Sequence, residues 1–440
     1  MKCFTPQIVG SLLLLTSCVQ FKPRPISAEH SSVEFGKRCL NDGGLKDFLA
    51  EQGALNLPWD VDKLSLVSVY FHPDVALARA EANEAAARLE TARMRLNPVL
   101  TFSPQFASSR PPIFTPWFLG ANLQVPIETA GKRGKRMDQA TAAAAAASWR
   151  VSARAWSARS RVRAAMLDLH GALQNTRLLE IEQRLHEEAI KKLAAQLEAG
   201  EVSPFELTQA RLMLNRTRLA LEDAQRLAAT TENRLATAVG VPIHAIQGVR
   251  LDFSSFEKLP EPKHGKQRAL TQRADLLALL AEYAAAECAL SLEVAKQYPD
   301  LNIGPGYDYN SGQNRWQLAL NLPLPFNRNR GPIAEAEARR STAEKRFLAQ
   351  QAAIEGELNV ALAGYQASRS KADTAEQLAK EAAAASQATK SMVRAGAVSA
   401  LEFTRRELEA STANIALQAA RIEAQIAAGA LEDAMQSPLR

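Results

Sequence analysis

Aromatic residues are scarce in this 440-residue chain, at 6% of the composition, and the net charge is only +6. A chain of this length can bury two or three globular cores. The abundance of Ala, Glu, Lys, Leu and Arg with helical periodicity is instead typical of long helices or coiled coils. Acidic residues are interleaved with the basic ones. No dense basic stripe is left for nucleic acid, which we therefore exclude as a partner.

Cysteine and histidine are also rare, with four and six residues. Cys39 and Cys288 have no C-x-x-C spacing, which argues against a disulfide framework or a cysteine-based metal site. The histidines form no H-E-x-x-H motif, and a nucleophile elbow is missing. His170 and His186 fall on one predicted helix, but no third ligand accompanies them. The sequence therefore indicates no enzyme, no cofactor and no dedicated metal site.

The N-terminus has the features of an export signal. Residues 8–15 form an apolar run that is too short to span a bilayer, and Lys2 precedes it, which predicts a signal peptide over residues 1–17. In place of an A-x-A site, Leu15-Thr16-Ser17-Cys18 resembles a bacterial lipoprotein box. This resemblance implies cleavage before Cys18 and acylation of that residue, an anchor of about 0.8 kcal/mol per buried CH₂. An ordinary secretory signal with an incidental Cys18 is the alternative.

The chain is an internal duplication. Residues 72–106 align without gaps on residues 273–307 at an offset of 201. Farther on, three more matches follow at offsets of 197, 197 and 196: Pro126 with Pro323, Gly134 with Gly331, and Gly200-Glu201-Val202-Ser203 with Gly396-Ala397-Val398-Ser399. We expect an N-terminal extended segment over residues 18–72, a first repeat over 73–240, a linker over 241–268 and a second repeat over 269–440.

Each repeat is predicted to contain the same elements in the same order. A helix (73–96 and 274–297) stops before Pro98 or Pro299, and two short strand segments follow. A helix of more than sixty residues comes next (135–199 and 332–395), closed by Gly200 or Gly396, and a shorter helix returns (204–239 and 400–435). At 1.5 Å per residue the long helices reach roughly 95 Å, longer than an ordinary globular domain.

The returning helices carry five heptads each. Each heptad has an apolar leading position and a small residue three positions later, which permits close approach of a neighbouring helix. Arg406 is the one residue that interrupts the series of small residues. A soluble coiled-coil spacer has the same pattern, so the heptads do not distinguish a spacer from a channel. The leading positions are Leu207, Leu214, Leu221, Ala228 and Leu235 in the first repeat, and Phe403, Ala410, Leu417, Ala424 and Leu431 in the second.

The strand segments (100–106, 117–125, 301–309 and 316–322) make that distinction. In the second of them, Leu119, Ala121 and Leu123 alternate with Gly120 and Asn122, so that one face is apolar. Segments of this kind are typical of a transmembrane β-barrel. Four strands do not close, and lipid does not tolerate an open edge. Three copies would supply twelve strands, enough for a barrel. A soluble four-stranded sheet is the alternative.

These elements, twice over and in this order, resemble the outer membrane factor (TolC-like) family from about residue 60 to the end. The strongest marks are the duplicated unit and the turn Arg394-Ala395-Gly396-Ala397-Val398-Ser399, followed by Glu402; Leu235-Ala236-Thr237-Ala238-Val239-Gly240-Val241-Pro242 is also similar. The resemblance implies a homotrimer with an outer-membrane β-barrel and a periplasmic α-barrel tunnel. It also implies an equatorial belt, formed by the N-terminal stretch, the segment around residues 240–266 and the C-terminus. It implies outer-membrane lipid, a periplasmic adaptor protein and an inner-membrane pump as partners, and a passive efflux conduit.

The string Ile127-Glu128-Thr129-Ala130-Gly131-Lys132-Arg133-Gly134 resembles the members of the family that serve heavy-metal cation exporters. It therefore favours metal cations as cargo. Drug efflux and type I secretion on the same scaffold are the alternatives within the family, and a lipid-anchored coiled-coil spacer is the alternative outside it. The string lacks the glycine spacing and the trailing Ser/Thr of a phosphate loop. We interpret it as a basic turn whose side chains reach lipid headgroups.

The resemblance also transfers roles to the two glycine turns, which would form the periplasmic tip. The adaptor docking residues would then be Gly200, Val202 and Ser203, with Gly396, Val398 and Ser399 in the second repeat. Glycine supplies a left-handed C-cap, and serine suits the N-cap of the returning helix. A plain helix–turn–helix corner explains the same residues.

A gate is implied beside that tip. Glu402 matches a carboxylate that lines the constriction in relatives, and Glu206 is its repeat equivalent. Three copies of such a carboxylate form a ring that favours cations and resists closure. Arg405 stands where the family commonly has an acidic residue, so a Glu402–Arg405 pair is one alternative. A simple helix-dipole role for Glu402 is another.

Overall fold

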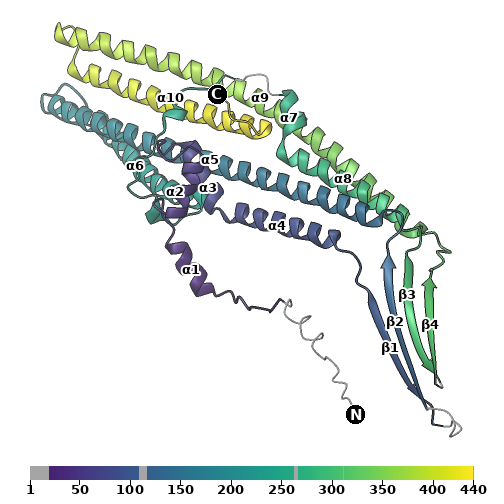
Figure 1. Ribbon diagram of the computed structural model, residues 1–440. Coiled ribbons are helices and arrows are strands. Elements are labelled where there is room, and N and C mark those ends of the chain that lie inside the picture. Colours follow the sequence, from purple (N-terminus) through teal and green to yellow (C-terminus); the bar gives the residue numbers. More distant parts are fainter. Residues whose placement is uncertain (1–18, 109–115, 262–265, 311, 440) are drawn as a thin grey trace.

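The computed structural model describes residues 19–108, 116–261, 266–310 and 312–439. The chain is an elongated bundle of helices with a four-stranded sheet projecting from one end (Figure 1). Cys18 and the signal peptide lie outside the described residues, so acylation stays a prediction. Within these ranges, no helix has both the length and the apolar character needed to cross a membrane.

The N-terminal segment, expected to be extended and equatorial, is instead mostly helical over its described residues 19–72. They contain α1 (Ala28–Gly36), α2 (Gly43–Glu51) and α3 (Val61–Phe71). The last two helices begin after Asp42 and Asp60, whose carboxylates each accept a hydrogen bond of 2.9 Å from the backbone N–H three residues on. Such N-caps stabilise short helices and explain why this segment is not extended.

Each repeat is built on one very long helix, α5 (Lys132–Glu198) or α9 (Arg330–Arg394), of 67 and 65 residues. The opening helices are α4 (Pro73–Arg93) and α8 (Ala274–Ala295), and the returning helices are α6 (Pro204–Val239) and α10 (Ala400–Met435). The predicted helix bounds are confirmed to within three residues. The linker between the repeats holds η1 (Ile243–Ala245), η2 (Ser254–Phe256) and α7 (Lys266–Gln272).

The heptad positions of the returning helices face their long helices. Along α6, Leu207, Leu214, Thr217 and Leu235 are buried, and α6 packs on α5. Along α10, the buried positions are Ala413, Ala420, Ala424, Leu431 and Ala434. The predicted coiled-coil seam is therefore confirmed. In addition α10 packs on α5, which joins the second repeat to the first.

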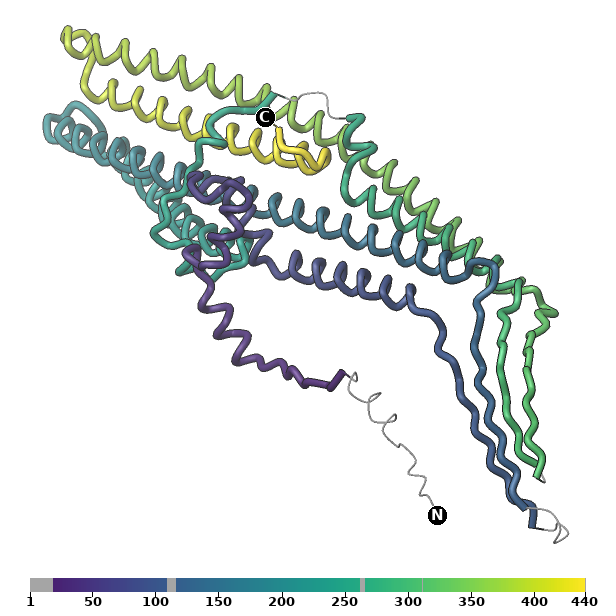
Figure 2. The backbone as a smooth tube through the Cα atoms, viewed as in Figure 1, coloured from purple at the N-terminus to yellow at the C-terminus, as the bar shows by residue number. Residues whose placement is uncertain are grey.

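An apolar core lies at the expected equatorial belt, and both helices of the repeats and segments outside the repeats contribute to it. Helices α2 and α3 and the first part of the linker lie against the middle of the bundle, whereas α1 points away from it (Figure 2). Leu64 of α3 and Met166 of α5 are fully buried there together with Leu235 of α6 and Phe256 of η2. Burial of such side chains stabilises the fold by roughly 1.5–3 kcal/mol each. Helices α2 and α3 and residues 241–256 of the linker thus pack in one core with α5 and α6.

The sheet is antiparallel in the order β1-β2-β3-β4, from β1 (Val99–Phe106), β2 (Trp117–Ile127), β3 (Leu301–Asn310) and β4 (Gln313–Asn321). Each repeat supplies one hairpin, and β2 pairs with β3 across the repeats. Among the described residues no further strand covers the outer edges of β1 and β4. The chain alone therefore leaves two open edges.

The strand register places apolar side chains on one face of all four strands. Phe102 lies opposite Ala121, Ala121 opposite Tyr307, and Tyr307 opposite Trp316. The next row carries Ser103, Gly120, Asp308 and Arg315 on the other face. On the apolar face Trp316 is 82% exposed and Leu318 is 73% exposed. The predicted alternation is confirmed.

The hairpin register corrects one repeat match. Phe102 faces Ala121, and its equivalent Ile303 faces Leu320, so Ala121 corresponds to Leu320 at an offset of 199. At the same offset Trp117 corresponds to Trp316, and Pro126 corresponds to Pro325. The match of Pro126 with Pro323 is therefore wrong by two residues, because the length difference lies in the turn that precedes the long helix.

Candidate gate, docking turns and junction

The two glycine turns have the same geometry. Gly200 and Gly396 have φ values of +75° and +74°. The N–H of Glu201 donates to the carbonyl of Gln196 at 2.8 Å, and the N–H of Ala397 donates to that of Met392 at 2.9 Å. This is the Schellman arrangement, in which glycine avoids the Cβ penalty of left-handed backbone. Both turns lie at the end of the bundle remote from the sheet (Figure 1).

Only one of the predicted serine caps forms. The Ser399 hydroxyl accepts a hydrogen bond of 3.2 Å from the N–H of Glu402. Ser203 occupies the equivalent position, but its side chain makes no capping bond. The N–H of Glu206 donates instead to the Ser203 carbonyl at 3.1 Å. Ser203 is therefore the N-cap residue of α6 by position, as predicted, but its side chain does not act as the cap, because the backbone itself satisfies that donor.

The predicted docking residues are accessible at this end. Gly200, Ser203, Gly396 and Ser399 are exposed, whereas Val202 and Val398 are half-buried. Val202 packs against a small apolar cluster of Leu193, Leu207 and Leu401, which joins the two helical hairpins. Lys192 of α5 adds a polar contact, because its Nζ donates to the Thr404 hydroxyl of α10 at 2.6 Å. No sequence pattern predicts this contact between repeats.

The predicted gate residues form two ion pairs that differ from the expected one. Arg405 lies 3.5 Å from the Glu206 carboxylate, so it connects α10 to α6. Glu402 pairs with Arg406 at 3.2 Å, four residues along the same helix. The alternative Glu402–Arg405 pair is therefore wrong, because Arg405 is turned towards the other repeat. Exposed pairs of this kind contribute about 0.2–1 kcal/mol each.

Glu407 is a further carboxylate beside the tip. Burial raises its pKa, and the nearby Glu188 carboxylate raises it further, while Lys192 and Lys390 act in the opposite direction. Like charge close to a partly buried carboxyl favours the protonated form. The contact of α10 with α5 therefore contains a group that responds to acid.

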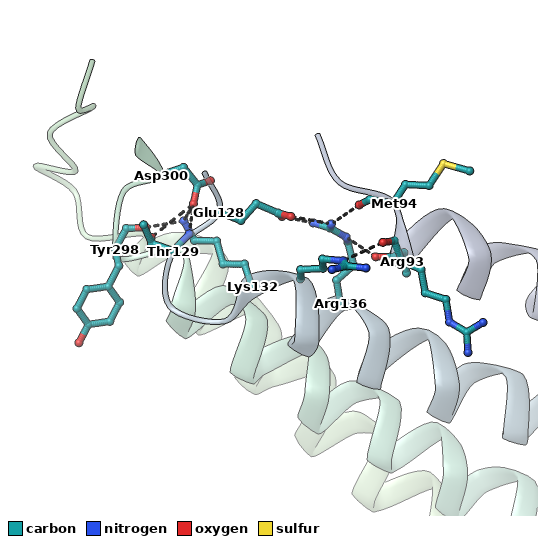
Figure 3. Close-up of polar contacts among 10 residues, drawn as sticks. Arg93, Met94, Glu128, Thr129, Lys132, Arg136, Tyr298 and Asp300 are labelled. Atoms are coloured by element: carbon teal, nitrogen blue, oxygen red, sulfur yellow. Dashed lines mark hydrogen bonds and ion pairs between the residues drawn. The ribbon is translucent and has the colours of Figure 1, made fainter. Parts of the chain in front are cut away.

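The basic string at the base of the sheet is a structural clasp (Figure 3). Lys132 is 7% exposed, and its Nζ donates to Asp300 Oδ1 at 2.7 Å and to the Tyr298 carbonyl at 2.6 Å. The Thr129 N–H donates to the same Asp300 oxygen at 2.9 Å. Lys132 therefore binds the start of β3, and the interpretation that it reaches lipid headgroups is wrong.

Arg136 completes this junction on the other side. It pairs with Glu128 at 2.6 Å, and its remaining N–H groups donate to the carbonyls of Ala92 and Met94 at 3.3 Å. These carbonyls belong to the C-terminal end of α4 and the residue that follows it. The turn before α5 is thus fastened both to the opening helix of its own repeat and to the strand of the other.

A second polar cluster that the sequence did not reveal lies at the equator. Arg163 is 8% exposed; its Nη1 donates to the Gln425 carbonyl at 3.0 Å, and its Nε lies 3.3 Å from Glu432. Gln425 Nε2 in turn donates to the Phe256 carbonyl at 3.0 Å. Burial lowers the pKa of Arg163, while Glu432 opposes that effect. The cluster joins α5, α10 and η2.

The histidines have separate surroundings. His170 lies 4.9 Å from the Phe253 ring, and burial lowers its pKa. His186 lies 3.6 Å from Glu182 on the same helix. Within the described ranges no three His, Cys, Asp or Glu side chains are arranged to hold a metal ion.

The model of the outer membrane efflux protein family matches residues 71–241 and 266–436, which are the two repeats. The chain belongs to the outer membrane efflux protein family. This membership places the protein in the outer membrane. It also identifies the duplication seen in the sequence and the fold as the duplication of this family.

One curated relative is the cobalt-zinc-cadmium resistance protein CzcC of Cupriavidus metallidurans, 23% identical over 260 residues. The aligned region covers 58% of this chain and 62% of that protein, so the chain matches less than two thirds of its length.

Solved channels share the fold. CusC superposes with a TM-score of 0.70 at 18% identity, covering 87% of this chain and 93% of that one. The outer membrane protein VceC of Vibrio cholerae gives 0.69 at 19% identity, covering 86% and 97%. The outer-membrane channel OprN gives 0.69 at 18% identity, covering 86% and 90%.

Proposed function

We propose that this protein is a passive homotrimeric conduit and the outer-membrane component of a tripartite efflux system. The observation that carries the proposal is the sheet, which has one apolar, exposed face and two unpaired edges. An apolar face of this kind suits contact with outer-membrane lipid. In lipid, each unpaired backbone group costs several kcal/mol, so the edges of β1 and β4 must pair with strands of other copies. Three copies supply twelve strands and close a barrel.

The helices extend the conduit from the barrel into the periplasm. At 1.5 Å per residue, the 67 residues of α5 reach about 100 Å. Two helical hairpins per copy, α5–α6 and α9–α10, give twelve helices in a trimer around one tunnel. The members of the family are efflux proteins. A conduit needs no catalytic step of its own. The energy for transport and the choice of substrate therefore come from an inner-membrane pump.

The tip opposite the sheet is proposed to serve docking and gating. Gly200, Ser203, Gly396 and Ser399 are exposed there in two turns of equal geometry, which suits repeated binding of a periplasmic adaptor. The Glu206–Arg405 pair bridges the two returning helices at the same end. It therefore resists their separation when the tunnel opens.

Heavy-metal cations are the proposed cargo. The relative CzcC is named for resistance to cobalt, zinc and cadmium, and Glu402 contributes one carboxylate per copy near the tip. A ring of carboxylates favours the entry of cations. The polar clasp of Lys132 with Asp300 means that the string 127–134 acts in the junction between barrel and helices, so it supports the fold rather than the choice of cargo.

Two measurements test the proposal. Native mass spectrometry of the detergent-solubilised protein should give three chains per particle; a monomer would contradict the shared barrel. In a host that lacks its own metal-efflux channel, expression together with the cognate pump and adaptor should lower accumulated Zn²⁺ and Cd²⁺. Efflux of organic drugs with unchanged Zn²⁺ and Cd²⁺ would assign the same conduit to another cargo and overturn the metal assignment.

A further inference from the structure

Two grooves on the chain have repeat-equivalent linings. The first groove lies between α4 and α5, and the second lies where α8 and α9 meet. On the opening helices, Ala85 and Ala92 of the first groove correspond to Ala286 and Glu293 of the second at the sequence offset of 201. Because α5 and α9 are continuous helices with C-caps at Ala199 and Ala395, a single offset of 196 holds along both, and the match of Gly134 with Gly331 at 197 is wrong by one residue. The corresponding pairs are Arg136 with Pro332, Gln139 with Glu335, and Ala140 with Ala336.

The second groove is covered by a helix of the other repeat. Gln139 of α5 contributes to its lining, and its volume is about 310 Å³. The first groove has a volume of about 1050 Å³ and is lined only by α4, α5 and the residues that follow α4. Helix α5 covers the second groove. No helix among the described residues covers the first groove in the same way.

The missing helix is the repeat equivalent of α5, which is α9. The four helices form one layer in the order α4-α5-α8-α9 (Figures 1 and 2). In this layer α5 packs against both opening helices, whereas α9 packs only against α8. One chain therefore has an open groove at one edge of the layer and, at the other edge, a long helix α9 that packs against only one opening helix.

We propose that α9 of a second copy of this chain occupies the first groove and reproduces the α5–α8 contact between subunits. Each copy offers one groove and one α9, so the contact is head-to-tail and closes into a ring when the rotation permits. The inference deepens the proposed trimeric conduit and rests on it, because it specifies which residues meet between the copies.

One ion pair identifies the register. Across the α5–α8 contact, Arg150 pairs with Glu282. At the offset of 196, the repeat equivalent of Arg150 is Arg346 on α9. At the offset of 201, the repeat equivalent of Glu282 is Glu81 on α4. Glu81 lines the first groove, and both Glu81 and Arg346 are exposed. Within the described part of the chain neither has an ion-pair partner, although their repeat equivalents are paired to each other. The structure thus assigns Glu81 to Arg346 of the neighbouring copy.

Charge reversal with rescue tests the pair. Glu81→Arg and Arg346→Glu should each speed dissociation of the detergent-solubilised trimer about tenfold, because like charges then meet at three equivalent contacts. The double variant should return to within about twofold of the unmodified protein. Glu90→Arg, on the same helix but outside the groove lining, should leave dissociation unchanged. Glu81→Arg combined with Lys345→Glu should show no rescue.

Cysteine cross-linking provides a readout that does not depend on energy. In a chain with Cys39→Ser and Cys288→Ser, the combination Glu81→Cys with Arg346→Cys should yield covalent dimers and trimers after oxidation. Glu81→Cys with Arg339→Cys, about 10 Å away along α9, should yield none. A trimer that lacks both the rescue and the selective cross-link overturns this inference alone, whereas a protein that is not trimeric overturns the proposed function.

Discussion

The carboxylate of Glu206 on α6 lies 3.5 Å from the guanidinium of Arg405 on α10. These helices come from different repeats, and the pair lies beside the two glycine turns. The relationship gives the tip a specific polar link between its two returning helices. Its strength is modest because both side chains are exposed.

Breaking this link should favour the open tunnel. Three pairs per trimer, each worth about 0.2–1 kcal/mol, shift the closed–open balance several-fold. Glu206→Gln and Arg405→Gln should therefore both raise the open probability in single-channel recordings. Arg226→Gln is the matched control, because Arg226 pairs with Asp223 three residues away on α6. An open probability equal to that of the control would remove the pair from the gate.

Glu402 should contribute to cation preference. We expect Glu402→Ala to lower the cation-to-anion permeability ratio, because three carboxylates are lost from the narrow end. The reversal potential under a salt gradient measures this ratio. Glu409→Ala is the control, since Glu409 also pairs with Arg406, at 2.9 Å, but lies two helical turns farther from the tip. If both variants keep the original reversal potential, Glu402 has no role in selectivity.

The turn at Gly396 should be needed for adaptor docking. A β-branched side chain at φ +74° is strained by about 1–2 kcal/mol, so Gly396→Val should reshape the turn. Cross-linking to the periplasmic adaptor should fall while the trimer mass is kept. Gly356→Ala, in the middle of α9 with open space around an added Cβ, should leave cross-linking intact. Equal cross-linking in both variants would contradict the docking assignment.

The Lys132 clasp should stabilise the junction between sheet and helices. Lys132→Met removes the buried ammonium that donates to both Asp300 and the Tyr298 carbonyl. The loss should lower the free energy of unfolding by about 1–3 kcal/mol. The midpoint of thermal unfolding should fall by several degrees, whereas Lys345→Met, at an exposed position, should not change it. An unchanged midpoint for Lys132→Met would show that the clasp is dispensable.

The tip should tighten in acid. Burial and Glu188 raise the pKa of Glu407 above the ordinary value of 4.5 in the folded chain, so its protonated form is favoured by the packed state. This contribution to the stability of the folded chain is complete below pH 4.5. It is lost as the pH rises through the elevated pKa of Glu407. Hydrogen exchange of the first turns of α10, corrected for intrinsic rates, should slow between pH 7 and 5. Glu407→Gln should remove this dependence, and an identical pH response in that variant would contradict the role of Glu407.

The elements of the repeat could be predicted because each has a local signal. Gly200 and Gly396 close the long helices, small residues mark the coiled-coil seam, and alternation marks the strands. The short helices α2 and α3 also had local signals, in their caps Asp42 and Asp60 and in apolar residues at helical spacing such as Leu45 and Leu49. These signals extend over only nine and eleven residues.

The polar clusters could not be predicted, because their partners are remote in sequence and unequal between repeats. Lys132 binds Asp300 across 168 residues, and the repeat equivalent of Asp300 is Val99, which offers no matching signal. Arg163 likewise meets Gln425 across 262 residues. Pairing choices such as Arg405 with Glu206 depend on how the two repeats pack, which a single helix pattern does not contain.

Single-channel recording from the purified protein in planar lipid bilayers tests the central claim most directly. If the β1 and β4 edges of three copies pair into one closed barrel, the protein should insert and give discrete conductance steps, with a higher open probability for Glu206→Gln. A protein that stays monomeric and produces no conductance in either form would contradict the shared barrel and the efflux function that depends on it.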